Sequence, residues 1–517
     1  MKNMKNFKTL LHYDLKQQSK SFIFVLMLIV ALLMSLVCGF IQVNDFAERQ
    51  AVYKEELRVA QEQQKEALAY SQFTIPVLFA PNPLSIFYRG VDESIGNKSI
   101  ISPVRLSDFE TTSQRFNPFL AMFANLDISG IVKILSIFVL LLAAGLISGE
   151  REECTFHLIF ANPVKRFDYY MSKFCVTGIS TLLSLFILFF VTAILLISNP
   201  MIQTTAEFWG RLGLVFLTSF LYLSLFIALG LILSACSQNA GISVLWGVII
   251  WISISFIYPN LVSTVTNKPL DADNRLAKRE IKNIEEDSYQ KYGAAMVWHV
   301  PSEVMIHIPF DCSFDQNIPE QRLLARSFLL DAVVSMSEKA VLESELANWE
   351  TMWPILWQYQ QEMQTQKDLM RQKQLRQQKN NHAFTCFLPD VLYEQSLATL
   401  TNTGIAYRDS YLRMELRRFR SQVFDYLDSK KAFTEKFFTQ FPKEQWSDNW
   451  DDYTDAEKEI YGNYQKQENY PRLEMTDVPT FTFTKKINFP AGLPVLLVVN
   501  ILLLIAGLAL FQKTKKS

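Results

Sequence analysis

The sequence predicts an all-α polytopic membrane protein with six transmembrane helices and two extracytoplasmic insertions, the larger of them mostly helical. Three observations predict this fold class. Of the 517 residues, 50% are hydrophobic and only 20% are charged, whereas a soluble domain carries about 25% charged residues. The apolar residues gather in six blocks of membrane-spanning length. The basic residues in the short flanks of these blocks fall on one side of a six-span topology.

Each apolar block is long enough to cross the roughly 30 Å of bilayer hydrocarbon, which takes about 20 residues of helix. The blocks contain one charged residue, Lys133, near the start of the second, from where a long side chain can reach the headgroups. The first block is expected to stay uncleaved, because it is longer than the apolar part of a signal peptide and no cleavage pattern follows it. The predicted spans are 22–43, 128–148, 174–197, 212–235, 240–258 and 491–511.

Positive charge predicts the orientation, because cytoplasmic loops of membrane proteins carry an excess of lysine and arginine. Five lysines precede the first span, four basic residues separate the second from the third, and three lysines follow the sixth. The loop at 198–210, on the opposite side, has none. We therefore expect both termini in the cytoplasm, and the protein in the bacterial cytoplasmic membrane. The basic residues are Lys2, Lys5, Lys8, Lys16, Lys20, Arg151, Lys165, Arg166, Lys173, Lys513, Lys515 and Lys516.

The topology places two long segments outside the cytoplasm, at 44–127 and 259–490. The smaller one opens with a polar helical run over 45–70, and the prolines that follow predict loops and extended pieces. The larger one is long enough to bury a core of its own, and 411–427 carries an apolar stripe at helical spacing. The remaining predicted segments are an outer loop at 198–211 and cytoplasmic pieces at 1–21, 149–173, 236–239 and 512–517.

The N-terminal residues 1–21 have the pattern of a basic amphipathic helix. Phe7, Leu10, Leu11 and Leu15 form an apolar stripe, with lysines around it. Such a helix lies in the membrane interface, with its apolar face in the lipid and its charges toward the headgroups. The alternative is a disordered basic tail.

Two cysteines, Cys312 and Cys386, lie in the predicted outer segments. A disulfide between them would close a long loop and restrict the unfolded chain, but the sequence alone does not show that their Cα atoms come within reach. The outer histidines show no close pair at metal-ligand spacing. We therefore predict a possible Cys312–Cys386 disulfide and no metal site.

The sequence has no recognisable catalytic or nucleotide-binding motif. It lacks the Gly-x-x-x-x-Gly-Lys phosphate loop, the Gly-x-Ser-x-Gly nucleophile elbow and the His-Glu-x-x-His and Cys-x-x-Cys zinc patterns. The formal charge of −1 gives no basic field for nucleic acid. We expect no catalytic residue, no cofactor and no nucleic-acid partner. If the chain takes part in driven transport, ATP and Mg²⁺ are bound by another polypeptide.

The substantial cytoplasmic element between spans is the segment 149–172. Its acidic start favours a helix N-terminus, apolar side chains follow, and Asn162-Pro163 ends the helix. A short amphipathic helix across the end of a bundle is suited to fit a groove on a motor protein. An interfacial loop anchored by arginine and lysine is the alternative, and the residues alone favour neither.

This segment resembles the coupling region of the membrane subunits of type-2 ABC exporters. The match runs over Ile147-Ser148-Gly149-Glu150-Arg151-Glu152-Glu153, then Thr155-Phe156, then Asn162-Pro163-Val164-Lys165-Arg166. Cys154 departs from the family pattern, which usually has glycine there, and this puts the local turn geometry in question. Outside this region, Asn125-Leu126-Asp127-Ile128 is similar to a subgroup that includes the nitrous-oxide-reductase maturation permease. Weaker likenesses lie at Pro83-Leu84-Ser85 with Gly90, and from Leu388-Pro389-Asp390 to Gly404.

The resemblance implies a permease subunit of an ATP-driven exporter. It implies a separate ABC ATPase subunit and a second permease copy or a paralogue as partners, beside the membrane lipid. A periplasmic or outer-membrane protein is a further candidate partner. The residues implied to couple to the ATPase are the charged Glu150, Arg151, Glu152 and Glu153, the apolar Phe156, Leu158 and Ile159, and the matched Thr155, Asn162, Pro163 and Arg166.

Two other functions compete with a permease. A membrane-anchored scaffold or sensor would bind a ligand or protein through the outer helical domain and would need no ATPase. A polytopic membrane enzyme would show paired ionisable residues within its spans, because charge in the bilayer is costly and usually functional. The predicted spans contain only Lys133, which argues against the enzyme.

Overall fold

The computed structural model describes most of the spans and parts of the two insertions. The described residues are 2–66, 75–90, 98–101, 109–110, 127–161, 164–202, 204–266, 385–386, 388–404, 407, 412–429, 490, 492–513 and shorter pieces within 279–287 and 358–372. Cys312, Asn162 and Pro163 lie outside them, so the predicted disulfide and the predicted Asn-Pro helix stop remain predictions.

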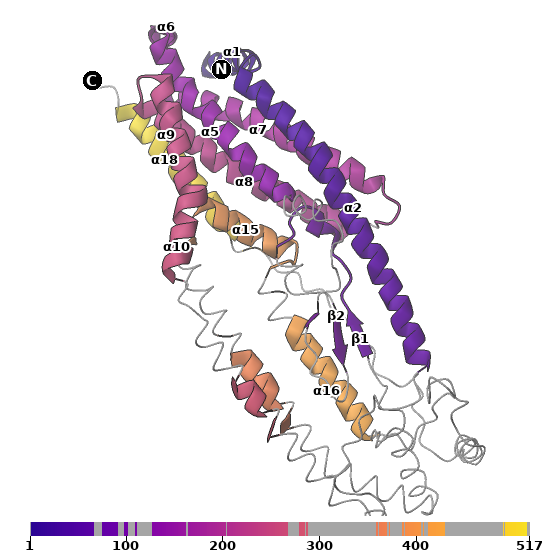
Figure 1. Ribbon diagram of the computed structural model, residues 1–517. Helices are drawn as coiled ribbons and strands as arrows, with labels where there is room; N and C mark the ends of the chain where they lie inside the picture. Colours follow the sequence, from indigo (N-terminus) through magenta and orange to yellow (C-terminus); the bar gives the residue numbers. More distant parts are fainter. Residues whose placement is uncertain are drawn as a thin grey trace, which may run out of the picture.

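A helical bundle forms the main body of the described structure (Figure 1). Within the described residues, six helices are long and apolar enough to cross a membrane, which confirms the predicted all-α membrane fold with six candidate spans. That the larger insertion is mostly helical stays a prediction. The helices of the bundle are α2 (Phe22–Glu66), α5 (Ile128–Glu152), α7 (Arg166–Ile197), α8 (Ala206–Cys236), α9 (Ala240–Ile252) with α10 (Tyr258–Thr266), and α18 (Gly492–Lys513).

The helices extend beyond the apolar blocks that predicted them. α2 continues without interruption from the first span into the predicted polar run, and its 45 residues measure about 68 Å at 1.5 Å per residue. Figure 1 shows it projecting well past its neighbours. In the fifth span a π-helical turn, Ser253–Ile257, joins α9 to α10. Hydropathy marks where lipid contacts a helix, whereas backbone hydrogen bonding continues wherever no residue breaks it.

α5 and α8 form the centre of the bundle and approach each other closely. A Cβ atom built on Gly230 of α8 would lie 2.6 Å from the Cβ of Ala143 and 2.8 Å from the carbonyl oxygen of Leu140. Ser234 accepts hydrogen bonds from the backbone N–H groups of Ile147 and Ser148, both at 2.9 Å. Small residues allow such close approach, on which helix packing in lipid depends.

The first insertion adds a small antiparallel sheet where the sequence predicted only extended pieces. Its strands, in the order β1-β2-β3, are β1 (Ile75–Leu78), β2 (Lys98–Ile101) and β3 (Phe109–Glu110). Ile75 pairs with Ile101, and Ser99 pairs with Phe109. A 3₁₀ turn at Pro83–Ile86 follows β1 and is capped by Asn82.

Part of the predicted outer domain packs against the spanning helices. Helix α15 (Pro389–Leu400) lies against α8 and α18, and its Asp390 accepts a 2.6 Å hydrogen bond from the hydroxyl of Tyr222 on α8. Lys133, the lone charge of the predicted spans, forms an ion pair with Glu394 of the same helix. With only 12 residues, two of them acidic, α15 carries no hydropathy signal, so only the tertiary structure reveals this contact.

The predicted apolar stripe at 411–427 is confirmed in helix α16 (Arg413–Ser429) and the residue before it. Leu412, Leu416, Phe419 and Val423 are all buried. The stripe therefore faces protein in this structure.

Candidate functional site

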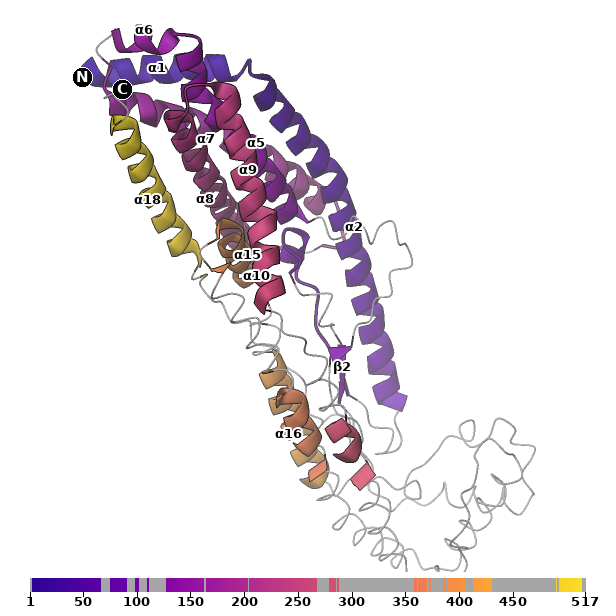
Figure 2. The ribbon, with the colours of Figure 1, turned by 60° about the vertical axis from the view of Figure 1, so that its left-hand side comes forward.

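The predicted coupling segment forms a short helix, α6 (Thr155–Ala161), at the end of the bundle. Figure 2 shows α6 at the same end as α1 (Lys2–Gln18) and the C-terminus. Leu158 points outward and is 69% exposed, and His157 beside it is exposed as well. Phe156, Ile159 and Phe160 instead pack against the bundle core. The helix thus has one apolar face toward its own chain and a second surface that is open.

The turn between α5 and α6 places Cys154 in the left-handed region, with φ of 58°. This is the position where the resembled family usually has glycine. Cys154 therefore adopts a backbone conformation that favours glycine, and its Cβ makes this conformation sterically unfavourable.

Replacing Cys154 with glycine is expected to raise the free energy of unfolding by about 1 kcal/mol, because glycine adopts positive φ without the Cβ clash. The thermal unfolding midpoint of the detergent-solubilised protein measures the effect. Cys154→Ala is the matched control, since it removes the thiol but keeps Cβ. An equal gain in both variants would show that the thiol, and not the backbone conformation, is responsible.

An aromatic cluster anchors the inner face of α6. Phe156 and Phe160 contact Tyr169 of α7, with ring centroids 5.8 Å and 5.2 Å apart. Tyr169 stacks on Phe511 of α18 at 5.6 Å. Aromatic pairs of this geometry each add about 0.5–1.5 kcal/mol beyond the area they bury. α6 is therefore packed directly on two spanning helices.

Two arginines extend this anchorage through both charge and hydrogen bonding. Arg151 lies over the ring of Phe156 and donates to the carbonyl oxygens of Ala235 and Ser237, at 2.7 Å and 3.1 Å, at the end of α8. Arg166 lies over the rings of Phe160 and Phe511 and donates to the Phe511 carbonyl at 3.1 Å. Both satisfy the carbonyl groups that a helix C-terminus leaves without partners.

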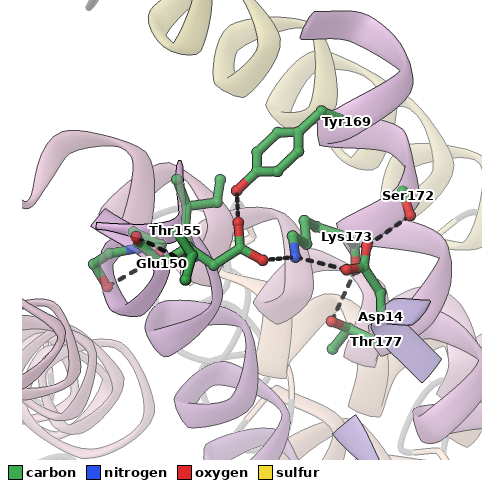
Figure 3. A network of polar contacts seen from close by, with 10 residues as sticks. Asp14, Glu150, Thr155, Tyr169, Ser172, Lys173 and Thr177 are labelled. Atoms are coloured by element: carbon green, nitrogen blue, oxygen red, sulfur yellow. Dashed lines mark hydrogen bonds and ion pairs between the residues drawn. The ribbon is translucent and has the colours of Figure 1, made fainter. Parts of the chain in front are cut away.

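A buried cluster of charged groups lies directly behind α6 (Figure 3). Lys173 of α7 forms ion pairs with Glu150 of α5 and with Asp14 of α1, the latter at 2.9 Å. Tyr169 donates to Glu150 at 2.5 Å, and Ser172 donates to Asp14 at 2.8 Å. All of the charged side chains are at most 5% exposed. The cluster ties three helices together at one point.

This charged cluster is connected to α6 itself. The hydroxyl of Thr155, the first residue of α6, donates to the carbonyl oxygen of Glu150 at 3.2 Å. Burying charges is expensive, and a buried pair is maintained only with good geometry and further hydrogen bonds. Two carboxylates share one ammonium, and hydroxyl groups supply the remaining donors. A displacement of α6 would therefore disturb contacts that α1, α5 and α7 all require.

The structure separates the predicted coupling residues into buried and exposed groups. Glu150 is inside the protein and cannot form a surface contact in this conformation, because its carboxylate is occupied by Lys173 and Tyr169. Glu152 accepts a 2.9 Å hydrogen bond from the N–H of Ala240 at the start of α9. Glu153 and Leu158 are exposed. Whether any of them contacts an ATPase stays a prediction.

Sequence reasoning missed Asp14 and the burial of Lys173. Lys173 was counted as a cytoplasmic flanking charge, but α7 begins at Arg166, so Lys173 already lies within the helix. The position of Asp14 in the sequence could have indicated that its side chain is buried. It lies three and four residues after Leu11 and Leu10, and so falls on the apolar stripe of its helix. A carboxylate on an apolar face needs a buried partner.

A model of the ABC-2 family transporter proteins matches residues 9–286, more than half of the chain. The chain belongs to the ABC-2 transporter family. A comparison with curated proteins finds no match. The matched region includes α6, the buried charged cluster and five of the six spanning helices.

Family membership identifies the chain as an ABC transporter permease, a membrane component that is generally not itself catalytic. It implies an ATPase partner and often dimerisation. The likeness to the subgroup of the nitrous-oxide-reductase maturation permease stays a prediction.

Proposed function

We propose that this permease is the transmembrane subunit of an ATP-driven exporter, and that a separate ABC ATPase subunit docks on α6. The observation that carries the proposal is the division of α6 into two faces. Its inner face is fixed to α5, α7 and α18 by aromatic contacts and by the arginines that lie over its rings, and its outer surface presents Leu158. The direction of transport comes from the family resemblance.

The contacts of α6 define how movement would pass from the ATPase into the membrane. A force on Leu158 acts on the packed rings of Phe156 and Phe160, and through them on α7 and α18. It also acts on Glu150 through Thr155. Packed interfaces change between discrete arrangements and do not deform continuously. We infer that the helices move together and change a path at the seam with a second permease copy or a paralogue.

The sidedness of this proposal follows from charge. α1, α6 and the C-terminal end of α18 lie at one end of the bundle, as Figure 2 shows. The segments at this end carry the lysines and arginines that favour the cytoplasm. An ATPase that uses cytoplasmic ATP and Mg²⁺ would meet the permease at this end.

Replacing Leu158 with glutamate is expected to weaken capture of the ATPase at least tenfold, without lowering the thermal unfolding midpoint of the permease. The reason is that burying an unpaired carboxylate in an apolar groove costs several kcal/mol, whereas the exposed side chain contributes little to the fold. The measurement is affinity capture of a purified ABC ATPase that binds the wild-type permease, with its coupled ATP hydrolysis as a second readout.

Met414→Glu is the matched control, because Met414 is 57% exposed and lies in α16, far from α6 and outside the spanning helices. It should leave capture unchanged. Equal capture by the wild-type and Leu158→Glu proteins would refute docking at α6 and favour the scaffold alternative.

A further inference from the structure

A cavity of about 250 Å³ lies at the end of the bundle away from α6, between α2 and the start of α8. Its apolar walls include Phe46 of α2, Leu84 of the 3₁₀ turn and Phe208 of α8. Its polar groups include Lys54 of α2 and Glu207 and Arg211 of α8. The cavity lining therefore combines apolar and charged side chains.

The walls of the cavity are held in place by contacts between the two insertions. Asn82 donates a 2.6 Å hydrogen bond to the carbonyl oxygen of Thr401, just after α15. Gly90 has φ of 56°, and a Cβ there would lie 2.6 Å from the carbonyl oxygen of Thr403. Arg211 donates to the Leu400 carbonyl at 3.2 Å. Segments far apart in the sequence thus form one preformed site.

The predicted spans place the cavity at the depth of lipid headgroups. Phe46 follows the end of the first predicted span at residue 43, and Arg211 directly precedes the fourth, which begins at residue 212. The location holds whichever side of the membrane this end faces.

The charges of the cavity favour an anionic group. Arg211 is 11% exposed, and its Nη2 lies 2.7 Å from Glu207 Oε1 in an ion pair. Lys54 is exposed and forms no ion pair within the part of the chain that the structure describes. Two cations therefore face one carboxylate, which leaves a net charge of +1. Guanidinium and ammonium groups both bind phosphate, and both line this cavity.

We propose that this cavity binds the phosphate-bearing headgroup of a membrane lipid. Arg211 and Lys54 contact the phosphate, and the acyl chains leave along the apolar wall formed by Phe46 and Phe208. Basic pockets between spanning helices bind lipid headgroups on the cytoplasmic side of membranes, and the same attraction between cations and phosphate acts at this end of the bundle. A volume near 250 Å³ suits a headgroup and is below the roughly 300–1,000 Å³ of sites for larger ligands. The proposal does not depend on the ATPase or on transport direction.

The test is native mass spectrometry of the purified full-length chain with three probes: phosphatidylglycerol, diacylglycerol and inorganic phosphate. Phosphatidylglycerol is expected to occupy a saturable site. Lys54→Glu should weaken this binding about tenfold, a change of about 1.4 kcal/mol. Gln50→Trp, which fills the cavity without changing its charge, should also reduce binding. Diacylglycerol, which lacks the phosphate, should not compete.

Arg58→Glu is the matched control, because Arg58 lies one turn further along α2, is exposed and is absent from the cavity lining. It should bind phosphatidylglycerol like the wild-type protein. Unchanged binding in both Lys54→Glu and Gln50→Trp would overturn the proposal. So would equal competition by diacylglycerol, which would show that phosphate is not recognised. Displacement of the lipid by inorganic phosphate would assign the cavity to free phosphate instead and refute the lipid.

Discussion

Replacing Lys173 with methionine is expected to destabilise the folded permease by about 3–5 kcal/mol, the cost of leaving a buried charge without its partner. Lys173 is 1% exposed and is the cation shared by Asp14 and Glu150. Without it, two carboxylates would remain buried close together, and each would lose its strongest interaction. The yield of monodisperse protein on size-exclusion chromatography and the thermal unfolding midpoint measure the loss.

Two further variants separate charge from packing. Lys165→Met changes an exposed lysine eight residues earlier and should behave like the wild-type protein. A triple variant, Lys173→Met with Asp14→Asn and Glu150→Gln, removes all three charges and should recover most of the stability, because a neutral cluster avoids the desolvation of charge. If Lys173→Met melts at the same temperature as Lys165→Met, the charged cluster does not hold these helices together.

Replacing Gly230 with alanine is expected to destabilise the protein by about 1–3 kcal/mol, the usual cost of overpacking a close-packed interior. The new methyl group would lie 2.8 Å from the Leu140 carbonyl oxygen and 3.1 Å from the backbone nitrogen of Ala144. Both neighbours are main-chain atoms, so relief would need movement of the whole of α5 against α8. The thermal unfolding midpoint is the measurement.

Gly213→Ala in the same helix is the control, because its expected change in stability has the opposite sign. A Cβ at Gly213 would meet nothing within 4 Å, so Gly213→Ala should stabilise α8 by up to about 1 kcal/mol through higher helix propensity. Equal shifts at the two glycines would contradict the close contact between α5 and α8.

The two sites were predictable from the sequence to different extents. The acidic start predicted for the coupling helix was wrong, because Glu150 and Glu152 lie at the C-terminal end of α5 and α6 begins at Thr155. The coupling segment was still located because its residues are contiguous and its apolar residues form a local pattern. The structure shows that this pattern serves two purposes, since Phe156 is fixed to the bundle and Leu158 is exposed. The cavity near Arg211 could not be predicted, because its walls come from α2, the first insertion, α8 and the chain after α15.

What the sequence by itself determined is the set of spans and, on the family resemblance, the permease class. The spans could be predicted because the transfer of a helix into lipid depends mainly on the composition of about 20 consecutive residues. The tertiary structure alone decided which charges are buried. The burial of Lys173 depends on Asp14 and Glu150, which lie far from it in the sequence, and the ion pair of Lys133 depends on Glu394 of α15. A charge becomes stable inside a membrane protein only through the partner that the fold brings to it.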